Sequence, residues 1–416
     1  MVAILGYSRQ QIFAAVQGMY TAVADSPTSP FHFPVGGSAC RLLGYPPERI
    51  DDLPKSLVES FAGVGYPFRA EAIQQGDRVL DIGSGAGIDS LIASRLVGPK
   101  GHVIALDLTH AMARKLKASI DEHSIDNISV IQASAERLPL ADASVDSITS
   151  NGALNLVPDK RRAVAEMFRV LRPKGRLQLA DVVIHRPVSV DCHDDPRLWV
   201  ECVVGATVKE DLLTLFHDAG FEDIRILRTL DYFAHSPSAQ TQEIAASFGA
   251  HSIELSMRRS PVAPPPLKRW LRHLDPRRWL AAIHRRSLAG MAALLMALLT
   301  CYGTLAVVAL LPLLGLGLSL NEGAWATAIA LFVLLTLAAI TAGMRRHRSL
   351  GPTVVGVIAT GILLYTLFVD YHILIELVGF LLLVAATGWD LYRRRRQEAR
   401  VLGLKPTASP PNLAKH

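Results

Sequence analysis

The sequence predicts a chain of two parts: an α/β domain with a mixed, mostly parallel sheet, followed by an all-α membrane domain of four transmembrane helices. Between Val79 and about Asp181, short β-branched apolar runs alternate with helix-like stretches, as expected of parallel strands joined by helical crossovers. Beyond residue 287, four apolar segments follow one another, each about 20 residues long and able to cross a hydrocarbon core of about 30 Å. Charge divides in the same way, because residues 1–257 hold 24 basic and 31 acidic side chains whereas residues 258–416 hold 19 and 6.

The strands of the α/β domain are expected in five segments, "RVLDI", "GHVIALDL", "ISVIQAS", "VDSITSN" and "GRLQLADV". Residues 207–219 have the apolar spacing of an amphipathic helix that ends at Gly220, and residues 221–234 indicate a further strand. This alternation predicts a sheet that carries helices on both faces.

These patterns divide the chain into five expected parts. They are an N-terminal helical lid or substrate region at residues 1–60, the α/β domain at 61–257, a basic Pro- and Arg-rich linker at 258–287, the four-helix membrane domain at 288–392 and a basic cytoplasmic tail at 393–416. The four spans are expected at residues 288–311, 324–344, 351–369 and 373–391.

Lysine and arginine are distributed unevenly around the apolar segments. Nine lie between Arg258 and Arg286, "RRHRS" separates the second and third segments, and "RRRR" follows the fourth, whereas the other two loops contain none. The positive-inside rule then predicts that both termini and the α/β domain face the cytoplasm at an inner or plasma membrane. The lipid bilayer is an expected partner and nucleic acid is not, because topology accounts for the basic residues. The oligomeric state stays open.

A glycine-rich turn follows the first expected strand, in "RVLDIGSGAGIDS" at residues 78–90. The strand ends in Asp81, and Gly83, Gly85 and Gly87 come at alternate positions, which permits close approach of a ligand to the backbone. Such turns hold several cofactors, but a carboxylate beside a helix N-terminus would repel a pyrophosphate. A cationic ligand is therefore favoured.

Later strand ends continue the same pattern. Asp107 ends the second strand, where it can accept hydrogen bonds from ribose hydroxyls. In this respect residues 60–235 resemble the class I S-adenosylmethionine-dependent methyltransferases, which have a Rossmann-like fold. The resemblance implies S-adenosylmethionine as cofactor, with Glu136 near the adenine and Asn151 at the end of strand four. The cofactor-binding residues that it implies are Asp81, Gly83, Gly85, Gly87, Asp107, Leu108, Ala135, Glu136 and Asn151.

Three longer stretches narrow the resemblance. The arsenite methyltransferase family has stretches similar to "GYPPERIDDLPKSLVESFAGVGYPF", "SNGALNLVPDKRRAVAEMFRVLRPKGRLQLADV" and "WVECVVGATVKEDLLTLFHDAGFEDI". That family binds As(III) through cysteine thiolates, and Cys202 in "ECVVGA" matches one of its cysteine positions. The resemblance implies methylation of arsenite or a related soft metalloid, with a thiol reductant as co-substrate.

Two positions depart from that family. Val64 stands where the family has cysteine in "GCG", and Gly152 stands where it has cysteine in "SNC". Because a soft metalloid binds best to several thiolates, Cys40 and Cys192 are candidates to supply the missing sulfurs. Alternatively, these two cysteines bind no metalloid and are small buried residues, as free cysteines often are.

The apolar segments resemble, more weakly, the MerC-type mercuric-transport family, in "RRHRS" between spans two and three and in "GWDLYRRRR" at the last span. The first span contains the single thiol Cys301, which the resemblance makes a candidate for metal transport. Two other functions stay open. One is a methyltransferase for a membrane-associated quinone or lipid, and the other is a non-catalytic metal-binding membrane protein.

Overall fold

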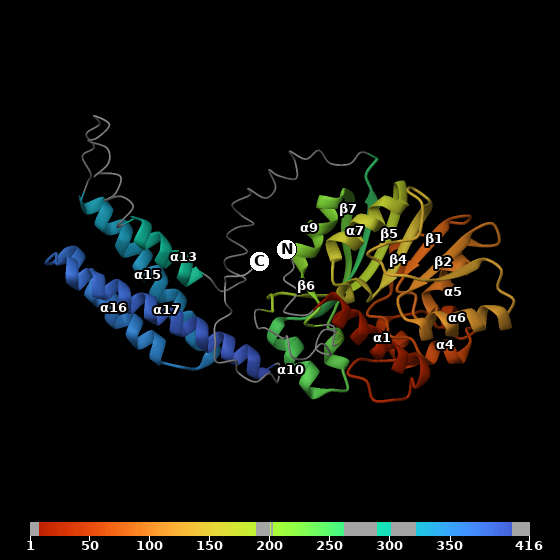
Figure 1. Ribbon diagram of the computed structural model, residues 1–416, viewed down its shortest axis with the longest axis horizontal. Helices are drawn as coiled ribbons and strands as arrows, with labels where there is room; N and C mark the ends of the chain where they lie inside the picture. The colour runs from red at the N-terminus through yellow and green to blue at the C-terminus, as the bar shows by residue number, and fades with distance from the viewer. Residues whose placement is uncertain (1–7, 189–199, 201–202, 262–288, 301–321, 402–416) are drawn as a thin grey trace. The chain divides into compact units, whose positions relative to one another are not determined.

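The computed structural model describes residues 8–188, 200, 203–261, 289–300 and 322–401. The chain divides into two compact units, Met1–His273 and Leu274–His416 (Figure 1). The first contains the whole sheet, and the second contains long apolar helices.

The first unit is built on an eight-stranded sheet in the order β3-β2-β1-β4-β5-β8-β7, with β6 beside β5. Its strands are β1 (Arg78–Ile82), β2 (His102–Asp107), β3 (Ile128–Gln132), β4 (Val145–Asn151), β5 (Leu171–Ile184), β6 (Thr207–Val208), β7 (Phe221–Leu230) and β8 (His251–Arg259). The pairs from β3 to β5 are parallel, whereas β8 runs antiparallel to both β5 and β7. The predicted mixed, mostly parallel sheet is confirmed.

Helices cover both faces of this sheet. Helices α5 (Ile88–Val97) and α6 (His110–Glu122) lie on one side, and α7 (Lys160–Val170) and α9 (Lys209–Ala219) lie on the other (Figure 1). The chain proceeds from β1 toward the β3 edge and then returns to β4, so the strand order reverses between β1 and β4. In open α/β sheets, ligands bind at the carboxyl ends of the strands beside such a reversal.

The core explains why these segments form central strands. Leu80, Ile104 and Ile148, on three neighbouring strands, are at most 2% exposed and belong to one apolar cluster. Met167 of α7 and Phe216 of α9 pack into the same cluster and are fully buried. Burying residues of this size stabilises the fold by roughly 1.5–3 kcal/mol each.

An N-terminal segment of short helices packs beside the sheet. It comprises α1 (Arg9–Asp25), α2 (Gly36–Leu43), α3 (Pro47–Ile50), α4 (Lys55–Glu59) and the 3-10 helix η1 (Pro67–Ala70). Ser8 caps α1, because its hydroxyl accepts from the Gln11 N–H while the Gln11 side chain accepts from the Ser8 N–H. Lys115 of α6 donates to the Ala24 carbonyl at 2.7 Å, which fixes the end of α1 against the domain.

The remaining elements of the first unit are η2 (Leu154–Leu156), η3 (Tyr232–His235) and α10 (Ala239–Phe248). The η2 turn follows β4 directly, so it lies at the carboxyl edge of the sheet.

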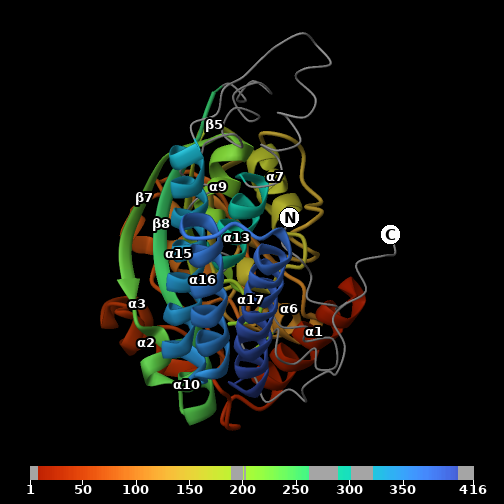
Figure 2. The same ribbon diagram turned by 90° about the vertical axis from the view of Figure 1, so that its left-hand side faces the viewer.

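The second unit consists, in its described residues, of α13 (Ala289–Leu298), α15 (Glu322–His347), α16 (Gly351–Phe368) and α17 (Ile373–Val401). These helices lie side by side (Figure 2). Three segments are long and apolar enough to cross a membrane: Ala326–Met344, Gly351–Phe368 and Ile373–Gln397. They correspond to the second, third and fourth predicted spans. The first predicted span is described only to residue 300, and its remainder lies outside the described residues.

We expect Gly87→Ala to destabilise the first unit through two effects. Gly87 has a φ of +99°, and a Cβ there would lie 2.9 Å from two carbons of Leu116. Strain and overpacking together should lower the free energy of unfolding by roughly 2–4 kcal/mol. The matched control is Gly76→Ala, at a φ of +81° with no atom within 4 Å of the added Cβ. Thermal unfolding followed by near-ultraviolet circular dichroism should show the smaller loss for Gly76→Ala, and equal losses would contradict the packing argument.

Candidate functional site

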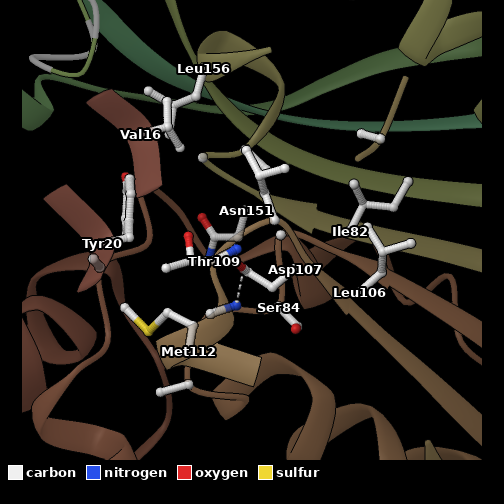
Figure 3. A pocket seen from close by; sticks show the side chains of 18 of the residues that line it. Val16, Tyr20, Ile82, Ser84, Leu106, Asp107, Thr109, Met112, Asn151 and Leu156 are labelled. Carbon is white, nitrogen blue, oxygen red and sulfur yellow. Dashed lines mark hydrogen bonds between the residues drawn. The ribbon is translucent and has the colours of Figure 1, made fainter. Parts of the chain in front are cut away.

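A cleft opens at the carboxyl ends of β1, β2 and β4, beside the reversal in strand order (Figure 3). The turn at residues 83–87 forms one wall, and Phe13, Val16 and Tyr20 of α1 contribute to another. The cleft and the open space at its mouth together amount to about 930 Å³.

The glycine turn is held by backbone hydrogen bonds. The N–H groups of Gly83 and Ser84 both donate to the Leu106 carbonyl, at 2.8 and 3.0 Å. Gly83 and Gly85 have φ values of +72° and +52°, which only glycine adopts without strain. An added Cβ at Gly85 would meet no atom within 4 Å, whereas one at Gly83 would collide with Ala153. The turn thus brings bare backbone to the edge of the cleft.

Asp107 connects this turn to the end of β2. Its carboxylate accepts from the Gly85 N–H at 2.8 Å and from the Thr109 N–H at 2.7 Å (Figure 3). The side chain is nearly buried, and this burial raises the pKa of Asp107 above its ordinary value. The Thr109 side chain and the Leu108 N–H also hydrogen-bond to this carboxylate, and Asp107 lines the cleft.

The charge of the lining is one-sided. Asp89 and Asp107 line the cleft, and none of its described lining residues is lysine, arginine or histidine. Ser84 lines the same cleft with a buried hydroxyl oxygen that has no hydrogen-bond partner among the described residues. Buried polar atoms are normally paired, so an orphaned oxygen and two uncompensated carboxylates fit a polar, cationic ligand. S-adenosylmethionine, with its ammonium and sulfonium groups, meets this requirement.

Asn151 joins three segments at the floor of the cleft. Its Oδ1 accepts from the Val64 N–H at 2.8 Å and from the Gly65 N–H at 3.2 Å. Its Nδ2 donates to Asp89 Oδ2 at 3.0 Å and to the Tyr45 hydroxyl at 2.9 Å. The side chain therefore fixes residues 63–65 and the start of α5 against the end of β4.

Most of the cofactor residues expected from the sequence line this cleft. They are Gly83, Gly85, Gly87, Asp107, Leu108, Ala135 and Asn151. Asp81 and Glu136 are not among the lining residues. Asp81 is buried and accepts from the Ser90 hydroxyl at 2.6 Å, and its pKa lies well above the ordinary value because of burial and the nearby charge of Asp89.

Glu136 has a role that sequence reasoning did not foresee. Its fully buried carboxylate forms an ion pair with Arg9 of α1 and accepts from the Asp159 N–H at 2.7 Å. Sequence reasoning also missed Ser84 and Asp89. The two side chains stand in the glycine-rich stretch itself, where polar residues between and after the glycines were the available signal.

The structure describes one of the three cysteines that are expected to bind the substrate. Cys40 lies in α2, is fully buried and does not line the cleft. Burial raises the pKa of its thiol to about 12, with the charge of Asp89 as a second cause. Cys192, Cys202 and Cys301 lie outside the described residues.

Val64 and Gly152, the two positions that depart from the cysteine pattern, face each other. A Cβ on Gly152 would lie 3.2 Å from Val64 Cγ1, and Val64 is 2% exposed. Gly152 lines the cleft, so the valine fills space beside its wall. A side chain at residue 152 would therefore meet Val64, and neither position supplies a thiol.

Comparison with known proteins identifies both parts of the chain. Residues 73–220 match the family model of a methyltransferase domain, and residues 288–392 match that of the MerC mercury resistance protein. The ubiquinone/menaquinone biosynthesis C-methyltransferase UbiE of Yersinia enterocolitica is 41% identical over 181 residues, covering 38% of this chain and 72% of that protein. The chain belongs to the S-adenosylmethionine-dependent methyltransferases.

In particular, it joins a methyltransferase domain similar to those of arsenite methyltransferases to a MerC-type domain, as the sequence predicts. The arsenite methyltransferase of Halobacterium salinarum is 40% identical over 164 residues, covering 39% of this chain and 42% of that protein. The chain thus spans less than half the length of that relative. The structure of CrArsM, an arsenic(III) methyltransferase from Chlamydomonas reinhardtii, is 30% identical, covers 55% of this chain and 75% of that one, and has a TM-score of 0.44.

We expect Cys40 to be unreactive in the folded protein. With a pKa of about 12, roughly one thiol in ten thousand is ionised at pH 8, and the thiolate is the reactive form. Maleimide labelling of the native chain, read by peptide mass spectrometry, should modify Cys40 only after denaturation. Rapid modification of Cys40 in the native chain would contradict its placement.

Proposed function

We propose that this chain is a membrane-bound methyltransferase that transfers a methyl group from S-adenosylmethionine to arsenite or a related soft metalloid. The observation that carries the cofactor assignment is the lining of the cleft, with two carboxylates, an orphaned Ser84 hydroxyl and no cationic side chain among its described residues. The similarity to arsenite methyltransferases supports the acceptor.

The residues of the cleft suit this cofactor in distinct ways. Asp107 would accept hydrogen bonds from the ribose hydroxyls, and Leu108 and Ala135 would border the adenine. S-adenosylmethionine supplies an electrophilic methyl group. The fixed floor at Asn151 and the apolar wall from α1 would orient the acceptor and exclude water, so that positioning carries most of the rate.

The acceptor would meet the thiolate of Cys202, and Cys192 stays a candidate for a second one. Because Val64 and Gly152 bring no sulfur to the cleft, we infer that the metalloid retains thiolates of its own from a small thiol such as glutathione. The lone pair of As(III) forms the new As–C bond and the S–CH₃ bond breaks. Arsenic is formally oxidised by two electrons, which the same thiol pool returns.

A second acceptor class is favoured by one observation, the apolar contact between Val64 and the position of Gly152. A quinone or lipid drawn from the bilayer would suit such a surface. The extent of the match to the quinone-pathway methyltransferase supports the same reading.

Cys202→Ser should lower arsenite methylation at least about a hundredfold, because loss of the anchoring thiolate misplaces the acceptor. The assay uses the full chain in lipid nanodiscs with methyl-labelled S-adenosylmethionine, arsenite and glutathione. Cys40→Ala is the matched control and should retain activity. Unchanged methylation in Cys202→Ser would contradict the thiolate site, and label that enters only lipid-extractable products without arsenite would establish the second acceptor class.

For the membrane part, we propose four spans, with the linker, the methyltransferase domain and both termini in the cytoplasm. The basic residues on one side of the spans support this orientation. Cys301 is proposed as a thiol that handles metal or metalloid at the membrane, which the match to the MerC family supports. Attachment of the methyltransferase domain to the membrane part raises the local concentration of any substrate that enters through the bilayer.

The orientation predicts opposite labelling of two new cysteines in a chain that has no others. Asp370→Cys, between α16 and α17, should react with an impermeant maleimide added to spheroplasts, because this loop would face outward. Lys405→Cys in the tail should react only after the membrane is permeabilised. The reverse pattern would overturn the proposed topology.

A further inference from the structure

The start of α5 carries a carboxylate whose position suggests a defined ligand contact. Asp89 lines the cleft and is 6% exposed. Its Oδ1 accepts from the Tyr45 hydroxyl at 2.6 Å, and its Oδ2 accepts from Asn151 Nδ2 at 3.0 Å. Two neutral donors therefore hold the carboxylate in place, and about two of its lone-pair positions remain free.

No cationic side chain among the described residues contacts this carboxylate. Burial raises the pKa of Asp89, and the hydrogen bonds from Tyr45 and Asn151 favour its ionised form. The buried Asp81 lies close enough for its pKa to be raised by the charge of Asp89. An ionised carboxylate beside a second buried acid is costly unless a cation arrives.

A separate observation at the same cleft points to a polar ligand. The Ser84 hydroxyl oxygen, in a residue 7% exposed, is buried without a partner among the described residues. Ser84 and Asp89 lie on either side of the glycines at 85 and 87. Asp107, at the end of β2, also lines the cleft and accepts from the Gly85 N–H at 2.8 Å. The cleft therefore has two carboxylates, one at the end of β2 and one on α5.

We propose that Asp89 binds the α-ammonium group of the methionine moiety of S-adenosylmethionine, while Asp107 holds the ribose. This inference rests on the proposed cofactor and names one of its contacts. Asp81, which directly precedes the glycine turn in sequence terms, stays behind the wall of the cleft, where Ser90 satisfies it. The residue that binds the ammonium group is therefore on α5 and not at the end of β1.

The test compares three ligands by isothermal titration calorimetry on the full chain in nanodiscs. S-adenosylmethionine has ammonium and sulfonium groups, S-adenosylhomocysteine has the ammonium alone, and methylthioadenosine has neither. Asp89→Asn should weaken the first two by roughly ten- to hundredfold, the loss of a hydrogen bond to a charged group. Methylthioadenosine should bind to Asp89→Asn with the affinity that it has for the wild type. This result would also show that the cleft of the variant is intact.

Two control variants separate a contact from a structural effect. Asp107→Asn should weaken all three ligands by a similar factor, because all three contain the ribose. Tyr45→Phe removes a hydrogen bond to Asp89 but keeps the carboxylate, so it should preserve the ratio of S-adenosylhomocysteine to methylthioadenosine affinity.

Three results would overturn the inference. Equal weakening of all ligands in Asp89→Asn would make the residue structural. Weakening of S-adenosylmethionine alone would assign Asp89 to the sulfonium. Binding of none of the ligands by the wild type would overturn the proposed cofactor itself, which distinguishes that failure from failure of the ammonium contact.

Discussion

Asp81, Asp89 and Asp107 all lie buried near the carboxyl edge of one sheet, and burial raises the pKa of each. The backbone N–H groups of Gly85 and Thr109, together with three neutral side chains, satisfy these carboxylates in part. No lysine, arginine or histidine belongs to the described lining of the cleft. The need for a cation at this place accounts for much of the surrounding architecture, from the bare glycines to the amide of Asn151. It also explains why a sulfonium cofactor suits a glycine-rich turn that resembles a phosphate-binding one.

The sequence predicted those parts of the site that depend on local pattern. The alternation of strands and helices, the glycines and the acid at the end of β2 all follow from short-range geometry, and the order of the central strands agrees with them. The contacts of Asn151 with Val64 and of Glu136 with Arg9 could not be predicted in this way, because they join segments 87 and 127 residues apart. The antiparallel β8 was missed for a similar reason: its place between β5 and β7 depends on pairing across the sheet.

The N-terminal segment converts an open sheet edge into an enclosed cleft. Gln17 of α1 donates to the Leu108 carbonyl at 3.2 Å, and Arg9 pairs with Glu136, so the start and the middle of the helix contact loops that follow β2 and β3. Phe13, Val16 and Tyr20 of the same helix line the cleft. Enclosure lowers the local dielectric constant and strengthens the interaction of a bound cation with the carboxylates. The cover that α1 provides and the carboxylates of the cleft would therefore both favour a bound cation.

Glu254 of β8 connects this N-terminal segment to the last strand of the sheet. It accepts from the Tyr66 N–H at 3.0 Å and from Arg69 at 2.7 Å, contacts that span 188 and 185 residues. During synthesis on the ribosome, residues 63–70 therefore wait for nearly the whole domain before they can dock. The apolar helices follow β8 in the chain, so this docking is complete only when they are next to be synthesised.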